Sequence, residues 1–286
     1  MITTSFAGRN LKIFFRDKSS VFFSLLAVFI IIGLYVLFLG DMLTGNLTSM
    51  PNARFLMDSW IMAGLLSVTA VTTTMGAFGI MVQDRERSNS KDFTASPIKR
   101  SSLAGGYILS SFVIGLIMSL ITLVLAEVYI VAYGGQVLGI KNLLQALGVM
   151  LLSVASSNAL VFFMVTFFKS NNAFATASTV LGTLIGFLTG VYIPVGQLPP
   201  VVQSVIKFFP VSHASVLFRQ VMMEKPLATA FAGAPDAMVN EFKHMMGVSY
   251  QFGGGEASAL TSLLILAATT VVFFILATWN LSRKQK

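Results

Sequence analysis

The stretch DRERSNSKDFTASPIKRSS, residues 84–102, carries eight charged side chains in a chain that is only 10% charged. On its two sides lie apolar stretches, roughly 60–82 and 103–129. Each is long enough to cross a bilayer, because ~30 Å of hydrocarbon needs about twenty residues at a rise of 1.5 Å. We therefore expect residues 84–102 to be a water-exposed connection between two transmembrane helices.

Four more apolar stretches of similar length lie in this chain of 286 residues, which is 55% hydrophobic. Its mean hydropathy of +0.81 is typical of a polytopic membrane protein. Each span is expected to be a helix, because an open strand in lipid leaves its backbone groups unpaired. We predict an all-α integral membrane protein with a single transmembrane domain over residues 1–286. Its six spans are expected at 21–40, 60–82, 103–129, 143–168, 173–195 and 260–279.

The distribution of lysine and arginine predicts the orientation. Thirteen of these residues lie in the two terminal segments and the second and fourth connections, and six lie on the opposite side. Short loops rich in positive charge stay in the cytoplasm. Both termini are therefore expected to be cytoplasmic, in the plasma membrane of a bacterium. Nucleic acid is not an expected partner, because the basic residues flank apolar runs as they do beside a membrane.

The amino-terminal segment 5–19 has the pattern of an amphipathic helix. Its basic side chains share one face and its apolar side chains share another, which predicts a helix lying along the membrane surface. The alternative is an ordinary basic flank that enforces topology. The residues that define the predicted helix are Arg9, Lys12 and Arg16 on the basic face, and Leu11, Phe14 and Phe15 on the apolar face.

The connection 83–102 has more structure than a simple loop needs. Ser88, Asn89 and Ser90 could cap a short cytoplasmic helix that carries Phe93 and ends at Pro97. An aromatic anchor ringed by charges is typical of a docking element. The alternative is a solvated loop that only fixes topology. The candidate contact residues are Asp84, Arg85, Glu86, Arg87, Asp92, Phe93, Pro97 and Arg100.

The order of these features resembles the membrane subunit of ABC-type-2 exporters. Those permeases carry an amphipathic leading helix, two spans, an acidic–basic run with a short coupling helix, and four more spans. One set of matching positions is Glu86, Arg87, Ser96, Pro97, Arg100 and Gly106. A second set, in GVYIPVGQLPPVVQSVIKFFPVSHASVLFRQVM, is Gly190, Pro194, Leu198, Pro199, Pro210 and Arg219. The resemblance covers nearly the whole chain, although Ser88 stands where the family often has glycine.

The resemblance implies partners for this chain. Two permeases, identical or related, pair in the membrane, and each receives a cytoplasmic ATPase subunit that binds ATP and Mg. Closing of the ATPases is passed through the coupling helix to the spans, which move an amphipathic or lipid-like substrate outward. Such a substrate is a drug, peptide, lipid or glycan precursor. The resemblance thus implies that the ATPase binds to residues 84–102 and that the basic face of residues 5–19 lies near this contact.

The chain itself lacks the usual residues for catalysis or cofactor binding. It has no cysteine and no G-x-x-x-x-G-K-[ST] phosphate loop, so we expect no nucleotide site and no bound cofactor. His213 and His244 stand far apart outside the predicted spans, and we expect both at the surface. Residues 84–92 hold three carboxylates, which keeps a membrane-embedded lipid-modifying enzyme as an alternative.

Ionisable residues are nearly absent from the predicted spans. Glu127, at the outer end of the third, is the nearest candidate, and we expect it in contact with water. An ion-coupled carrier usually needs such groups inside the membrane, so it is the less favoured alternative. The polar residues are instead hydroxyls, amides and glycines, which either pack helices together or line a substrate path. They include Thr69, Thr72, Thr73, Ser156, Asn158, Gly182, Gly186 and Gly190.

The segment 196–259 is expected outside the membrane. Residues 199–209 are too short to span and too apolar for a free loop, which predicts an interfacial or re-entrant helix. Trp60 and Trp279 lie at span ends, where their rings are expected at the membrane interface.

Overall fold

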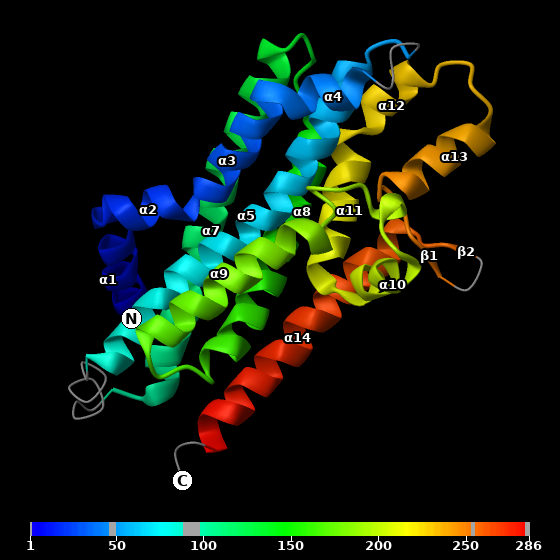
Figure 1. Ribbon diagram of the computed structural model, residues 1–286. Helices are drawn as coiled ribbons and strands as arrows, with labels where there is room; N and C mark the ends of the chain where they lie inside the picture. Colours follow the sequence, from blue (N-terminus) through cyan, green and yellow to red (C-terminus); the bar gives the residue numbers. More distant parts are fainter. Residues whose placement is uncertain (1, 46–49, 88–97, 253–254, 284–286) are drawn as a thin grey trace.

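In a computed structural model of the chain, the described residues are 2–45, 50–87, 98–252 and 255–283. They are almost entirely helical (Figure 1). The described strands, β1 (Gln251–Phe252) and β2 (Gly255–Glu256), form one short antiparallel hairpin. The predicted all-α membrane class is confirmed.

Four helices are long and apolar enough to cross a membrane, and two bent helix pairs bring the number to as many as six. The straight ones are α5 (Ala53–Glu86), α7 (Arg100–Ala132), α8 (Ile140–Val165) and α14 (Ala259–Arg283). Helix α5 is the centre of the bundle: 83% of its most apolar window is buried, against 17% for α14. It packs against α7, α8, α9 and α11.

The first predicted span is broken rather than straight. Helix α2 (Lys18–Ser24) and the helical run from Leu26 meet at 44°. The run comprises α3 (Leu26–Leu34), the π-helical turn η1 (Tyr35–Leu39) and α4 (Gly40–Gly45). Asp17 separates α2 from α1 (Ile2–Arg16), because its side chain accepts hydrogen bonds from the backbone N–H groups of Ser19 and Ser20 and so caps α2.

The fifth predicted span is shorter than expected. Helix α9 (Asn171–Leu188) ends before residue 195, because Gly190 adopts a left-handed conformation with φ of 67° and turns the chain away. The chain then passes through a short 3₁₀ turn, η2 (Val195–Gln197).

The segment 196–259 does not lie wholly outside the bundle. Helices α10 (Pro200–Phe208) and α11 (Pro210–Met222) meet at 88°, and each begins with a proline, which fits the first turn of a helix. The bend agrees with the predicted re-entrant helix, but α11 packs against α5, α8 and α14 within the bundle. The remaining helices of the segment are α12 (Glu224–Ala230) and α13 (Asp236–Met245).

Figure 1 places the start of α1, the end of α5, the start of α7 and the end of α14 at one end of the bundle. Helices α4 and α12 lie at the other end. Both chain ends therefore share a side with the charged connection, as the predicted topology requires. We call this the coupling end and its opposite the outer end.

The buried Arg219 contacts two turns of the backbone, one after α9 and one after α13. Arg219 on α11 is fully buried, and it donates to the carbonyl oxygens of Gly190 (2.9 Å) and Gly247 (3.3 Å). Its guanidinium lies 4.7 Å from the ring centre of Trp60. Within the described parts of the chain, no carboxylate forms an ion pair with it. Backbone carbonyls and an aromatic ring thus replace the missing anion.

Two expectations about ring side chains are wrong. Trp60 is not at the membrane interface: it is only 1% exposed, and its Nε1 donates to the carbonyl of Met246 at 2.7 Å. His213 is not at the surface: it is fully buried, with Nε2 2.9 Å from the carbonyl of Lys207 and Nδ1 3.0 Å from the hydroxyl of Ser262. Both rings satisfy their polar atoms inside the protein, which hydropathy alone does not reveal.

We predict that Arg219→Met lowers the free energy of unfolding by about 2–4 kcal/mol, because two buried carbonyl groups lose their donors. The midpoint of thermal unfolding in detergent measures the effect. The exposed Arg16→Met variant is the control and should shift the midpoint little. Equal shifts in the two variants would show that Arg219 contributes no more than a surface arginine.

Candidate functional site

Asp84 links three helices at the coupling end. Its carboxylate, which is nearly buried, accepts from both terminal nitrogens of Arg9 on α1, at 2.8 and 3.0 Å. The hydroxyl of Tyr107 on α7 donates to the same carboxylate at 2.7 Å. Hydrogen bonding to Asp84 raises the pKa of Arg9 further above its usual range, so the guanidinium stays charged. Asp84 therefore faces the interior of the protein.

The next two residues of α5 contact the connection between α8 and α9. Arg85 donates to the carbonyl oxygens of Val165 (3.0 Å) and Phe168 (3.5 Å), at the end of α8. Glu86 accepts from the backbone N–H of Asn171 at 3.2 Å, where α9 begins. A carboxylate at a helix start and a guanidinium at a helix end both complement the helix dipole. The end of α5 thus holds α8 and α9 in place.

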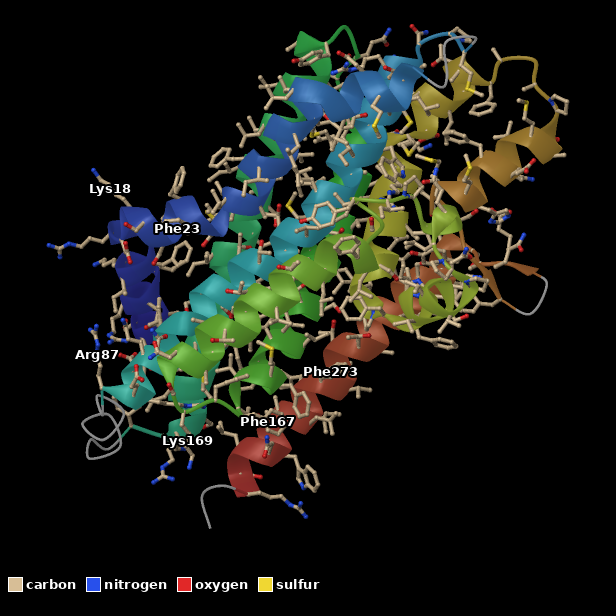
Figure 2. All side chains as sticks on the ribbon, in the orientation of Figure 1. Lys18, Phe23, Arg87, Phe167, Lys169 and Phe273 are labelled. Carbon is tan, nitrogen blue, oxygen red and sulfur yellow. The ribbon has the colours of Figure 1, made fainter. Side chains whose placement is uncertain are left out.

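Several cations near this network are exposed. Arg87 ends α5, Lys99 and Arg100 begin α7, and Lys169 lies in the α8–α9 connection. Figure 2 shows Arg87 and Lys169 projecting from this end of the bundle. Asp92, Phe93 and Pro97 lie outside the described residues. Glu86, Arg87 and Arg100 are therefore the predicted contact residues that are exposed among those the structure describes, and Glu86 is hydrogen-bonded to the N–H of Asn171.

The predicted amphipathic helix exists as α1, which packs along α7. Lys12 and Arg16 are exposed, as expected for a basic face, but Arg9 points inward to Asp84. Phe14 and Phe15 do not share a face: Phe14 is 1% exposed and Phe15 is 37% exposed. Adjacent residues on a helix are 100° apart, so only one of the two rings can enter the core.

The polar residues predicted within the spans are mostly buried, and one of them, Asn158, joins two helices. Asn158 on α8 donates to the hydroxyl of Ser111 on α7 at 2.6 Å. Thr69 and Thr73 are buried and donate to carbonyl oxygens of their own helix, α5. Ser156 is also buried on α8, and no hydrogen bond of its hydroxyl is found among the described residues.

Thr72 differs from its neighbours because it lines a groove of about 420 Å³ between the first broken span, α5 and α9. The groove mixes aromatic, hydroxyl and glycine residues. Those that carry the later argument are Phe23, Thr72, Gly76, Phe174, Ser178 and Thr179.

The three glycines of α9 and its continuation do not form one packing stripe. A side chain at Gly182 would meet nothing within 4 Å, whereas one at Gly186 would collide with Tyr192. Gly190 lies beyond the helix, in the turn held by Arg219. Gly186 and Gly190 therefore allow close contact, but with the loop that follows α9 and not with another helix.

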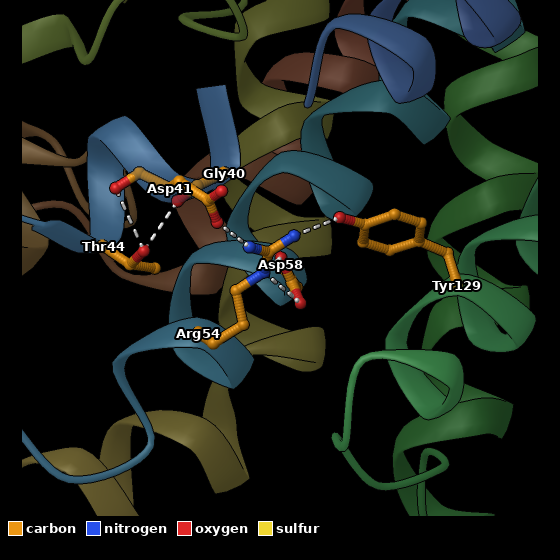
Figure 3. Close-up of polar contacts among 6 residues, drawn as sticks. All are labelled: Gly40, Asp41, Thr44, Arg54, Asp58 and Tyr129. Atoms are coloured by element: carbon orange, nitrogen blue, oxygen red, sulfur yellow. Dashed lines mark hydrogen bonds and ion pairs between the residues drawn. The ribbon is translucent and has the colours of Figure 1, made fainter. Parts of the chain in front are cut away.

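The outer end contains a charged cluster that sequence patterns did not indicate (Figure 3). Arg54 donates to Asp58 (3.0 Å), Asp41 (2.8 Å) and the hydroxyl of Tyr129 (2.9 Å). Helix α5 begins seven residues before the predicted span, so Arg54 and Asp58 fall within it. A side chain at Gly40 would collide with Arg54. The i, i+4 spacing of Arg54 and Asp58 was the available signal.

A second polar contact at this end joins α8 to α12. Glu224 accepts from Lys141 at 3.1 Å and from Asn142 at 2.7 Å, and these hydrogen bonds lower the pKa of its carboxyl. The contact is exposed, so it fixes geometry more than it stabilises the fold. Within the described ranges, no three His, Cys, Asp or Glu side chains are placed to hold a metal ion.

Comparison with known proteins gives the family. A family model described as an ABC-2 family transporter protein matches residues 43–279, most of the chain. A comparison with curated proteins finds no match. Members of this family are transmembrane components that lack a nucleotide-binding domain of their own and generally partner with a cytoplasmic ATPase. The chain therefore belongs to the ABC-2 transporter family, as a multi-pass membrane permease subunit of an ABC transporter.

Proposed function

We propose that this permease is half of the membrane part of an ATP-driven exporter, with both termini in the cytoplasm. It pairs with a second permease, and two cytoplasmic ATPase subunits supply the force. The observation that carries the proposal is the network at the coupling end: the last turn of α5 contacts α1, α7 and the α8–α9 connection. These contacts lie directly beside the charged connection 84–102.

Asp84 provides the transmission in this proposal, rather than direct contact with the ATPase. Two charge-assisted bonds from Arg9 and one from Tyr107 tie α1 and α7 to α5. Such bonds are stronger than neutral ones, and a bidentate pair fixes relative orientation. A displacement applied to the connection would therefore move three helices together.

The exposed cations provide the docking charge. Arg87 and Lys99 flank the segment that carries Phe93, with Lys169 close by at the same end. We expect the ATPase to have a pocket for the phenylalanine with acidic residues around it. Protein interfaces commonly have an apolar core, a polar rim and complementary charges.

Helix α9 is the proposed boundary with the second permease. It packs on α5, and its opposite side exposes Thr176 and Thr183, whose hydroxyls bond to the carbonyl four residues earlier. Residues three, four and seven apart share a helix face. Small hydroxyl residues on an uncovered face suit close packing against another helix in lipid.

The groove beside α9 is the proposed path for cargo. Phe23 and Phe174 give it apolar walls, while Thr72, Ser178 and Thr179 provide hydroxyls. A groove of this composition suits a substrate with both apolar and polar parts, such as a drug, peptide, lipid or glycan precursor.

The buried charges do not favour an ion-coupled carrier. Asp58 is held by Arg54, and Arg219 by two backbone carbonyls, so each has a structural role. Of the three carboxylates proposed for a lipid-modifying enzyme, the two within the described residues are also engaged, since Asp84 binds Arg9 and Glu86 binds the start of α9. Membership of a transporter family supports the permease over both alternatives.

The purified chain alone is expected not to hydrolyse ATP, because its sequence has no phosphate-binding loop. Co-expression with its own ATPase subunit should yield a stable complex that does. Phosphate release measures both preparations. Turnover by the chain alone, at a rate that survives repurification, would contradict the proposal.

Arg87→Glu is expected to reduce recovery of the ATPase subunit in a pull-down several-fold, because it reverses an exposed charge beside the docking segment. Lys225→Glu makes the same change at an exposed residue of the outer end and is the matched control. Equal recovery with the two variants would place the ATPase contact elsewhere.

The link between α1 and α5 can be measured with a double-mutant cycle. Arg9→Met, Asp84→Asn and the double variant should give a coupling energy of about 1.5–3 kcal/mol, typical of hydrogen bonds to charged groups. The exposed pair of Lys141 and Glu224 should give less than about 1 kcal/mol. Thermal unfolding in detergent provides the values. A coupling energy no larger than that of Lys141 and Glu224 would contradict the proposal that Asp84 transmits motion between the helices.

A further inference from the structure

A cavity of about 370 Å³ lies at the outer end, where α5, the end of α7, the α7–α8 connection and α12 meet. Its apolar wall includes Phe55, Ile130 and Met222. Its polar lining includes Ser59, Glu127 and Lys225. A mostly apolar cavity with a few converging polar groups is the usual form of a small-molecule site.

Two polar atoms in this lining are buried without a hydrogen-bond partner among the described residues. Glu127 accepts from the backbone N–H of Leu138 through Oε2 at 2.9 Å, which orients the carboxylate and leaves Oε1 unused. Ser59 is 1% exposed, and its hydroxyl is also unpaired. Buried polar groups are nearly always hydrogen-bonded in folded proteins, so both atoms indicate a missing partner.

The charges around the cavity indicate whether the missing partner is positively or negatively charged. The lining holds two carboxylates, Glu127 and Glu224, and one ammonium, Lys225, which leaves a net charge of −1. Both oxygens of Glu224 are already occupied, one by Lys141 and the other by Asn142. Glu127 forms no ion pair with any described residue. The uncompensated negative charge of the cavity is therefore on Glu127.

We propose that this cavity binds a small amphipathic primary amine in its ammonium form. The ammonium carries three donors and no acceptor, so it can donate to Oε1 of Glu127 and to the hydroxyl of Ser59 together. Its hydrocarbon part then packs on Phe55, Ile130 and Met222. Ala228 and Lys225 are exposed at the rim, which opens the cavity to the outer end. The inference does not depend on the identity of the exported substrate or on ATPase coupling.

Isothermal titration of the full-length chain in a non-ionic detergent, with hexylammonium as the probe, tests the proposal. Titration into detergent alone corrects for partitioning. Hexan-1-ol has the same hydrocarbon chain without the charge and is the matched ligand control. We expect saturable binding of hexylammonium, at least tenfold tighter than that of hexan-1-ol.

Variants locate the binding. Glu127→Gln removes the charge with little change in shape and should weaken hexylammonium binding at least tenfold. Glu241→Gln, at an exposed residue of α13, is the control and should bind as the unaltered chain does. Ala228→Phe, which fills the rim without touching Glu127, should also weaken binding. If gel filtration shows that Glu127→Gln is misfolded, the Ala228→Phe variant tests whether the amine binds in this cavity.

Three results would overturn the proposal. The first is an absence of saturable binding, which would mean that water alone satisfies Glu127 and Ser59. The second is equal affinity for the amine and the alcohol. The third is unchanged affinity in a folded Glu127→Gln or Ala228→Phe variant.

Discussion

Most polar groups buried in this bundle find their partners within the protein, because hydrocarbon offers none. Helix α5 meets this constraint at both ends. At the coupling end Asp84 is bound by Arg9 and Tyr107, and at the outer end Asp58 is bound by Arg54. These contacts recruit α1 and α7 to the central helix. The packing of the bundle follows from where these few charges can be neutralised.

Such an arrangement makes α5 suited to carry motion. Its 34 residues extend about 51 Å at 1.5 Å each, which exceeds the thickness of the hydrocarbon core. Glu86 at its end contacts the start of α9, so a displacement of the charged connection would act on α5 and α9 together. The groove proposed for cargo lies between those two helices and the first span. Force applied at one end therefore has a short physical route to the walls of the groove.

Apolar length was enough to predict α5, α7, α8 and α14, because a twenty-residue apolar run has few alternatives to a membrane helix. It failed where polar atoms meet across the fold. Amphipathic side chains such as Trp60 and His213 are expected at an interface or a surface. Trp60 instead donates to the carbonyl of Met246, far along the chain, and His213 is bonded to the carbonyl of Lys207 and the hydroxyl of Ser262. At the coupling end, sequence indicated the charged run, but not that Asp84 points inward while Arg87 points outward. The ion pair with Arg9 accounts for the inward orientation of Asp84, and the sequence does not reveal it.

Arg219 shows why such pairings decide the outer half of the fold. A buried cation without an acid is tolerated only where several dipoles converge on it. Gly190 and Gly247 supply carbonyl oxygens, and both adopt left-handed conformations that favour glycine. The two turns are therefore shaped around one guanidinium, which holds α11 against α5 and ends α9 at its observed length. Because α9 ends there, its exposed threonine face stays clear of the outer loops and available for the second permease proposed here.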